Sequence, residues 1–109
     1  MNVLQLNDNF GYGGTEKNLE LIGRNLGSNF DSFFCCFGEP GPRFERLIEE
    51  GYNGICTEDV KELQDFIVEN DIDVVHYHGG GLDNIVLQIS DAVDFIVKTA
   101  NFGWPSSFS

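Results

Sequence analysis

The chain has 109 residues and carries 18 acidic side chains against six basic ones, which gives a formal net charge of −12 at pH 7. This charge argues against nucleic acid and anionic membrane as partners, because phosphate groups repel a negative surface. Hydrophobic residues make up 41% of the chain, and no apolar run approaches the roughly 20 residues that cross a bilayer. We therefore expect one folded domain over residues 1–109, with no transmembrane segment.

Source and location follow less directly from the composition. Met1 leads straight into an apolar strand with no basic leader, so we expect no signal peptide and a cytoplasmic protein. A halophilic source would explain the acidic surface, and so would ordinary solubility.

The apolar pattern alternates between strands and helices along the chain. In order, it predicts a strand Val3–Leu6, a helix Gly14–Leu26, a strand Ser32–Phe37, a helix Pro42–Glu50, a strand Gly54–Cys56, a helix from Thr57 to Asn70, a strand Ile72–Tyr77, a helix Leu82–Ser90 and a strand Phe95–Val97. Residues 99–109 have no clear period. Thr57 resembles the N-cap of the third helix, with Glu58 and Asp59 complementing the helix dipole.

Strand and helix that alternate in this way predict an α/β fold. We expect a doubly wound, mainly parallel, Rossmann-like sheet of about five strands with helices on both faces. Right-handed crossovers favour a strand order such as 3-2-1-4-5.

The three cysteines lie in strand-like runs. Cys35 and Cys36 are adjacent, so they point to opposite faces of a strand and are poorly placed to share a metal. We interpret them, with Cys56, as buried reduced thiols. No Cys/His spacing resembles a zinc site, and we expect no metal.

A glycine loop follows the first strand and opens the first helix. Backbone N–H groups at a helix start attract anions, and Gly13 and Gly14 remove the Cβ atoms that keep a phosphate away. The loop is no dinucleotide fingerprint, because Glu16 stands where the third glycine of G-x-G-x-x-G belongs. It is no ATPase phosphate loop either. The glycines can equally serve only to permit a tight turn, and Glu16 fits helix capping better than catalysis.

Four segments should meet at the carboxyl edge of the sheet, where open α/β sheets bind ligands. They are the Asn7–Glu16 loop, the Gly38–Pro42 turn, His76–Gly81 and Thr99–Trp104. His76 and His78 share one side of their strand, and either imidazole can bond a sugar hydroxyl or a phosphate. We interpret His76 as a structural core histidine and His78 as the functional one.

Three short motifs follow one another in the same order as in a known enzyme family. The sequence Gly13-Gly14-Thr15-Glu16-Lys17-Asn18-Leu19 resembles a G-G-x-E-x-x-L motif, and Asp73-Val-Val-His-Tyr-His78 resembles D-V-V-H-x-H. Between them, Gly51 and the strand after it match G-x-x-V. Together they resemble the N-terminal, acceptor-side part of retaining GT-B glycosyltransferases, of the glycosyl transferase group 1 or family 4 type. The resemblance covers nearly all of the chain.

The resemblance implies roles for particular residues. Donor phosphate would be bound by Gly13, Gly14 and Thr15. Acceptor or sugar would be bound by His76, His78, Gly79, Asn101 and Phe102. His78 and Asn101 would be the candidate catalytic residues. Asn101 stands where many members carry a His in a T-x-H context, so a role that requires imidazole would be lost there.

The resemblance also implies a nucleotide-sugar donor, as substrate and not cofactor, and an unidentified acceptor. The family's C-terminal domain, which grips the donor through a paired-Glu motif, has no counterpart in this sequence. We therefore expect a truncated domain with little or no transferase activity by itself. That domain, or a second copy, would cover an exposed sheet. The alternatives are a non-catalytic Rossmann-like module that binds a partner or regulates, and another doubly wound enzyme such as an epimerase or reductase.

Overall fold

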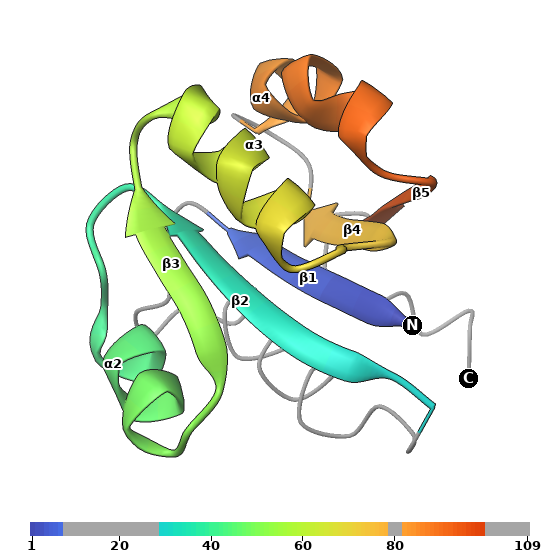
Figure 1. Cartoon of the computed structure of the whole chain (residues 1–109). Helices are drawn as coiled ribbons and strands as arrows, with labels where there is room; N and C mark the ends of the chain where they lie inside the picture. The colour runs from blue at the N-terminus through green and yellow to red at the C-terminus, as the bar shows by residue number, and fades with distance from the viewer. Residues whose placement is uncertain (8–28, 79–81, 100–109) are drawn as a thin grey trace, which may run out of the picture.

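A computed structural model describes residues 1–7, 29–78 and 82–99, with the backbone alone for His78 and Thr99 (Figure 1). These residues form a five-stranded sheet in the order β3-β2-β1-β4-β5. The strands are β1 (Asn2–Asn7), β2 (Asp31–Phe37), β3 (Asn53–Thr57), β4 (Val74–His78) and β5 (Phe95–Thr99). Every neighbouring pair is parallel. The predicted α/β class and strand order are confirmed.

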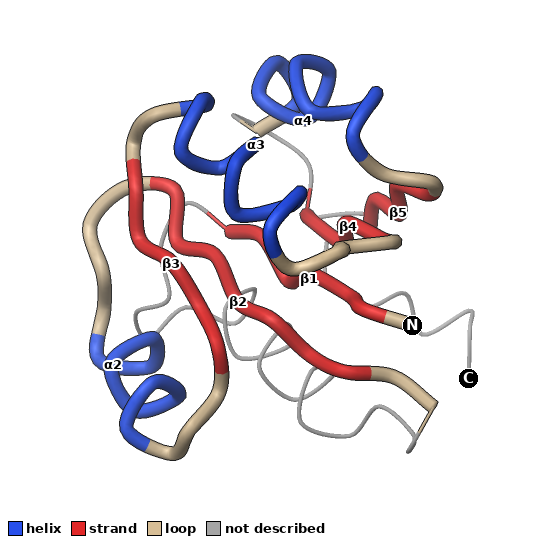
Figure 2. Tube along the Cα trace, viewed as in Figure 1, coloured by secondary structure: helices blue, strands red, loops and turns tan. Residues whose placement is uncertain are grey.

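Helices cover both faces of the sheet (Figures 1 and 2). Helices α3 (Val60–Glu69) and α4 (Asp83–Ile89) pack over one face, which we call the α3 face, and a 3₁₀ turn (Ser90–Ala92) follows α4. Helix α2 (Pro42–Glu49) packs over the other face, the α2 face, along β2 and β3. The alternation of side chains along each strand therefore separates two hydrophobic clusters.

The larger cluster lies under α3 and α4. Leu4 and Leu6 of β1 meet Val75 and Tyr77 of β4 there, and each pair is in register. From the helices, the buried side chains are Leu63, Phe66 and Ile67 of α3, and Val86 and Ile89 of α4. Strand β1 is thus apolar on a face that is fully covered, as expected for the centre of a parallel sheet.

The smaller cluster lies under α2, where Phe34 and Cys36 of β2 contact Phe44 and Leu47 of the helix. The helix can approach closely because β3 presents Gly54 at this point. A Cβ at Gly54 would lie 2.7 Å from the carbonyl oxygen of Phe34 and 3.0 Å from Cδ1 of Ile48. Cys35 belongs to the other cluster, so the prediction that Cys35 and Cys36 face opposite ways is confirmed.

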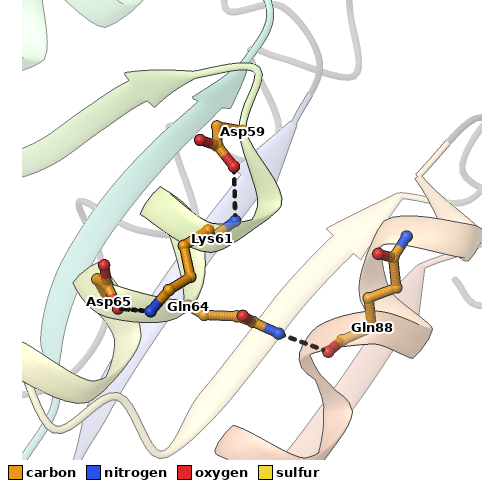
Figure 3. Close-up of polar contacts among 5 residues, drawn as sticks. All are labelled: Asp59, Lys61, Gln64, Asp65 and Gln88. Atoms are coloured by element: carbon orange, nitrogen blue, oxygen red, sulfur yellow. Dashed lines mark hydrogen bonds and ion pairs between the residues drawn. The ribbon is translucent and has the colours of Figure 1, made fainter.

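The N-terminus of α3 corrects the predicted cap. Asp59, and not Thr57, is the N-cap, because its carboxylate accepts a 2.8 Å hydrogen bond from the Lys61 backbone N–H (Figure 3). Thr57 belongs to β3, in register with Phe37, and its hydroxyl accepts from the Asp59 N–H at 3.0 Å. Sheet pairing holds Thr57 extended, so the helix begins at Val60.

The other boundaries shift by one or two residues. Strands β3 and β5 are longer at their ends than predicted, and β4 begins at Val74 instead of Ile72. The fourth predicted helix ends as a 3₁₀ turn after Ile89. On the outside, Gln64 of α3 donates to the carbonyl oxygen of Gln88 at 2.9 Å and ties α3 to α4 (Figure 3). The predicted helix Gly14–Leu26 lies outside the described residues.

Candidate functional site

The strand order creates a switch between β1 and β4. From β1 the chain proceeds outward through β2 to β3, and it then crosses back to place β4 on the other side of β1. Connections that leave two neighbouring strands in opposite directions open a crevice at their carboxyl ends, and open α/β sheets bind ligands there. Asn7 ends β1 and His78 ends β4 at this edge.

Three buried polar side chains lie on the α2 face of these two strands. Gln5 is completely buried, Asn7 is 4% exposed and His76 is 8% exposed. Gln5 and His76 are in register, so their side chains point the same way from neighbouring strands. Buried polar groups are uncommon in the centre of a sheet and need partners, which makes this group the clearest departure from an apolar core.

A hydrogen bond of 2.6 Å joins His76 Nδ1 to Gln5 Oε1. A carbonyl oxygen only accepts, so this bond requires the proton on Nδ1. Within the described part of the chain, Gln5 Nε2 is buried and has no hydrogen-bond partner. The pair therefore fixes the imidazole in one tautomer and presents an amide donor on the same face.

A second polar cluster lies near the same edge on the α3 face. The Tyr77 hydroxyl donates to Asp83 Oδ1 at 2.8 Å, and Lys98 Nζ lies 3.2 Å from the same oxygen. Burial, and then the hydrogen bond to Asp83, raise the pKa of Tyr77 above its ordinary value. The bonds from Tyr77 and Lys98 hold the pKa of Asp83 below its ordinary value. This cluster links β4, α4 and β5.

The predicted site residues are only partly described. His76 lies in β4 beside Gln5, and the backbone of His78 ends β4 in register with Thr99 of β5. The His78 side chain lies outside the description, as do the predicted phosphate and sugar residues, which are Gly13, Gly14, Thr15, Gly79, Asn101 and Phe102. Of the four segments expected at the carboxyl edge, the described parts are Asn7, the turn that follows β2, and the ends of β4 and β5.

Sequence reasoning named Asn7 only as the start of the Asn7–Glu16 segment, and it missed Gln5 and the Tyr77–Asp83–Lys98 cluster. One signal for Gln5 was present, since a polar residue between Leu4 and Leu6 interrupts a strand that is apolar on its neighbouring positions. The Asp83 cluster has no comparable local signal, because its members come from three elements.

Two further observations concern metals and membranes. Within residues 1–7, 29–78 and 82–99, no three His, Cys, Asp or Glu side chains gather closely enough to hold a metal ion. In the same ranges, no helix has the length and apolar character needed to cross a bilayer.

Comparisons with protein-family models, with curated proteins and with solved structures find no match to this chain.

Proposed function

We propose that residues 1–109 form the acceptor-side domain of a glycosyltransferase that moves a sugar from a nucleotide-sugar donor to an acceptor. The observation that carries the proposal is the buried Gln5–His76 pair, which adjoins the β1–β4 switch. Support from the sequence comes from the order of the G-G-x-E-x-x-L motif, which follows β1 in the chain, and the D-V-V-H-x-H motif, which includes β4. Both lines of support point to one edge of the sheet.

In this proposal the first motif binds the donor phosphate, and the second contacts the reacting sugar or the acceptor. The N–H groups of Gly13 and Gly14 would approach the donor diphosphate and stabilise the charge that develops on the leaving phosphate. The Gln5–His76 hydrogen bond would set the imidazole at the base of the crevice, while His78 and Asn101 would contact the reacting sugar or acceptor. The domain's net charge of −12 means that local N–H groups, not a basic cleft, would hold the phosphate.

The isolated chain is expected to bind without transferring. In the family that the motifs resemble, a second domain holds most of the donor nucleotide. A crevice without that domain does not exclude water or close over the donor, and both features assist transfer. We therefore expect weak binding of a nucleoside diphosphate-sugar by residues 1–109.

Amide NMR with increasing UDP-glucose and GDP-mannose tests the proposal. The Gly13 and Gly14 amides and the His76 and His78 rings should shift at millimolar ligand, and uridine without phosphate should move them less. The amides of Lys61 and Gln88, on the outer surface of the helices, serve as the remote control. Shifts that are absent from both glycines and both histidines at millimolar ligand would contradict the proposal.

One observation favours the second candidate, a non-catalytic module that binds a partner. Strand β5 is an edge strand, and its apolar side chains are exposed, with Phe95 at 60%, Ile96 at 38% and Val97 at 47%. An exposed apolar edge attracts another chain. Light scattering over a concentration series separates the two: association that Val97→Lys abolishes supports the module, and a monomer at every concentration argues against self-association through β5.

A further inference from the structure

Cys36 and Cys56 lie side by side on neighbouring parallel strands. They are direct partners in the β2–β3 register, so both point to the α2 face. Neighbouring strands are about 4.8 Å apart, which falls within the roughly 4.4–6.8 Å that separates Cα atoms across a disulfide. The two thiols are therefore placed to bond with little movement of the backbone.

The hydrogen bonds of the two thiols converge on one turn. Cys36 Sγ donates to the Glu39 carbonyl oxygen at 3.0 Å, and Cys56 Sγ donates to the Gly38 carbonyl oxygen at 2.9 Å. Gly38 and Glu39 are consecutive, so the sulfur atoms approach neighbouring carbonyl groups beyond the ends of β2 and β3. Both cysteines are reduced, and their weak S–H bonds go to two consecutive peptide groups.

The surroundings of the two thiols differ. Cys36 is completely buried beneath α2. Cys56 is half-buried and lines an open pocket of about 360 Å³ between α2 and the edge strand β3. The pocket wall is apolar at Pro40, Phe44 and Ile48, and it carries two carboxylates, Glu45 and Glu49. A reagent that enters this pocket reaches Cys56 first, and it meets negative charge.

We propose that Cys56 and Cys36 form a thiol–disulfide exchange site that accepts small cationic disulfides through the α2–β3 pocket. The Cys56 thiolate attacks one sulfur of the disulfide R–S–S–R, forms Cys56–S–S–R and releases RS⁻. The Cys36 thiolate then attacks Cys56 Sγ, forms the Cys36–Cys56 disulfide and releases a second RS⁻. Two protein thiols are oxidised and lose their two protons to solvent, and one reagent disulfide is reduced to two thiolates, which take up protons from solvent according to their pKa.

Glu45 and Glu49 make the pocket favour positively charged disulfides over negatively charged ones. They stand one helical turn apart on α2, and both contribute to the pocket lining. A positive charge on the reagent is attracted by this pair, whereas a negative charge is repelled, and added salt screens both effects. The apolar wall accommodates the short carbon chain of the reagent.

Cys35 is the internal control for the site. It neighbours Cys36 in the chain but points to the α3 face, where it is completely buried. Burial, and then the proximity of Cys36 and Cys56, raise the pKa of the Cys35 thiol far above its ordinary value. Cys35 is in register with Ile55, not with a cysteine, and it faces away from the α2–β3 pocket, so Cys35 should stay reduced while Cys36 and Cys56 react.

The test treats the intact chain with three disulfides at about pH 8.5, near the ordinary thiol pKa, and maps the products by mass spectrometry. The probes are cystamine, which is cationic, hydroxyethyl disulfide, which is neutral, and oxidised glutathione, which is anionic. We expect a first adduct at Cys56, its replacement by a Cys36–Cys56 disulfide, and reaction with cystamine about two- to fivefold faster than with the neutral reagent. Oxidised glutathione should be slowest.

Variants then separate the two steps. Cys36→Ser should stop the reaction at the Cys56 adduct, and Cys56→Ser should leave Cys36 unmodified. Glu45→Gln with Glu49→Gln should remove the advantage of cystamine without changing the neutral rate. Adducts that appear on Cys35 as fast as on Cys56, equal rates for all three probes, or a Cys56 adduct that persists in the unaltered chain would each overturn the proposal. The unaltered chain alone can give these outcomes, so folding of the variants is not required.

Discussion

Gln5 and His76 are 71 positions apart in the chain, and their side chains meet at 2.6 Å across β1 and β4. The bond joins two neighbouring strands at the switch of the sheet, on the face opposite the larger hydrophobic cluster. It therefore couples the packing of the sheet to the tautomer of an imidazole. Loss of either partner should affect both.

Replacing Gln5 with Leu tests this coupling. The variant leaves a buried imidazole N–H without its acceptor, which costs about 1–3 kcal/mol of unfolding free energy. We expect urea unfolding at lower concentration, and ¹⁵N NMR should show that the Nδ1–H tautomer of His76 is no longer the single form. Gln88→Leu on the exposed side of α4 is the matched control and should change stability by less than about 0.5 kcal/mol. If His76 keeps the same single tautomer in Gln5→Leu, Gln5 does not determine that tautomer and the proposed coupling is wrong.

The second prediction concerns acid. The folded pKa of Asp83 is lowered, first by the bond from Tyr77 and then by the bond from Lys98. The stability contributed by Asp83 is therefore present above its unfolded pKa, about 3.9, and is lost as pH falls through the lower folded value. In Tyr77→Phe the Asp83 pKa should rise toward its ordinary value, as measured by ¹³C NMR of the carboxyl group. Lys98→Met should raise the Asp83 pKa as well, because it removes both a hydrogen bond and a positive charge. An Asp83 titration that is identical in all three proteins contradicts the cluster.

The third prediction concerns the start of α3. Asp59→Ala removes the only side-chain cap that the structure describes for this helix and should cost about 1 kcal/mol. Asp65→Ala is the matched control, because Asp65 makes an exposed 3.0 Å ion pair with Lys61 that contributes about 0–0.5 kcal/mol. Chemical denaturation of both variants measures the difference. If both variants lose the same unfolding free energy, the Asp59 cap contributes no more than an exposed ion pair.

The fourth prediction concerns the packing of α2 against β3 at Gly54. Gly54→Ala should destabilise the chain by about 1–3 kcal/mol, because the new methyl group would lie 2.7 Å from the backbone carbonyl oxygen of Phe34 and the strands would have to shift. The second obstacle is the end of the flexible Ile48 side chain, so Ile48→Ala in the same chain should restore only part of the loss. Full restoration would show that the helix, and not the sheet backbone, sets the limit.

Much of the fold could be predicted from local pattern. Apolar runs located the strands, and the right-handedness of crossovers favoured an order such as 3-2-1-4-5, which the sheet adopts. The cap of α3 could not be predicted, because Thr57 and Asp59 are both good capping residues. Pairing of Thr57 with Phe37, a contact between distant segments, decided between them.

The polar sites depended on such distant contacts throughout. His76 was identifiable from its motif, but its partner Gln5 could not be, since the register of β1 against β4 selects it. The alignment of Cys36 with Cys56 likewise depends on the register between two strands. A slip of one residue between β2 and β3 would place the two thiols on opposite faces, and no local pattern specifies that register.

The central position of β1 has a consequence for biosynthesis. Strand β1 leaves the ribosome before the two strands that border it, and its β4 partner contains His76, 71 positions after Gln5. Until β4 has been translated, Leu4 and Leu6 have only one neighbouring strand and incomplete cover. Contacts this distant are made late and slow the folding reaction. The nascent chain must therefore be protected from association until most of it has been synthesised.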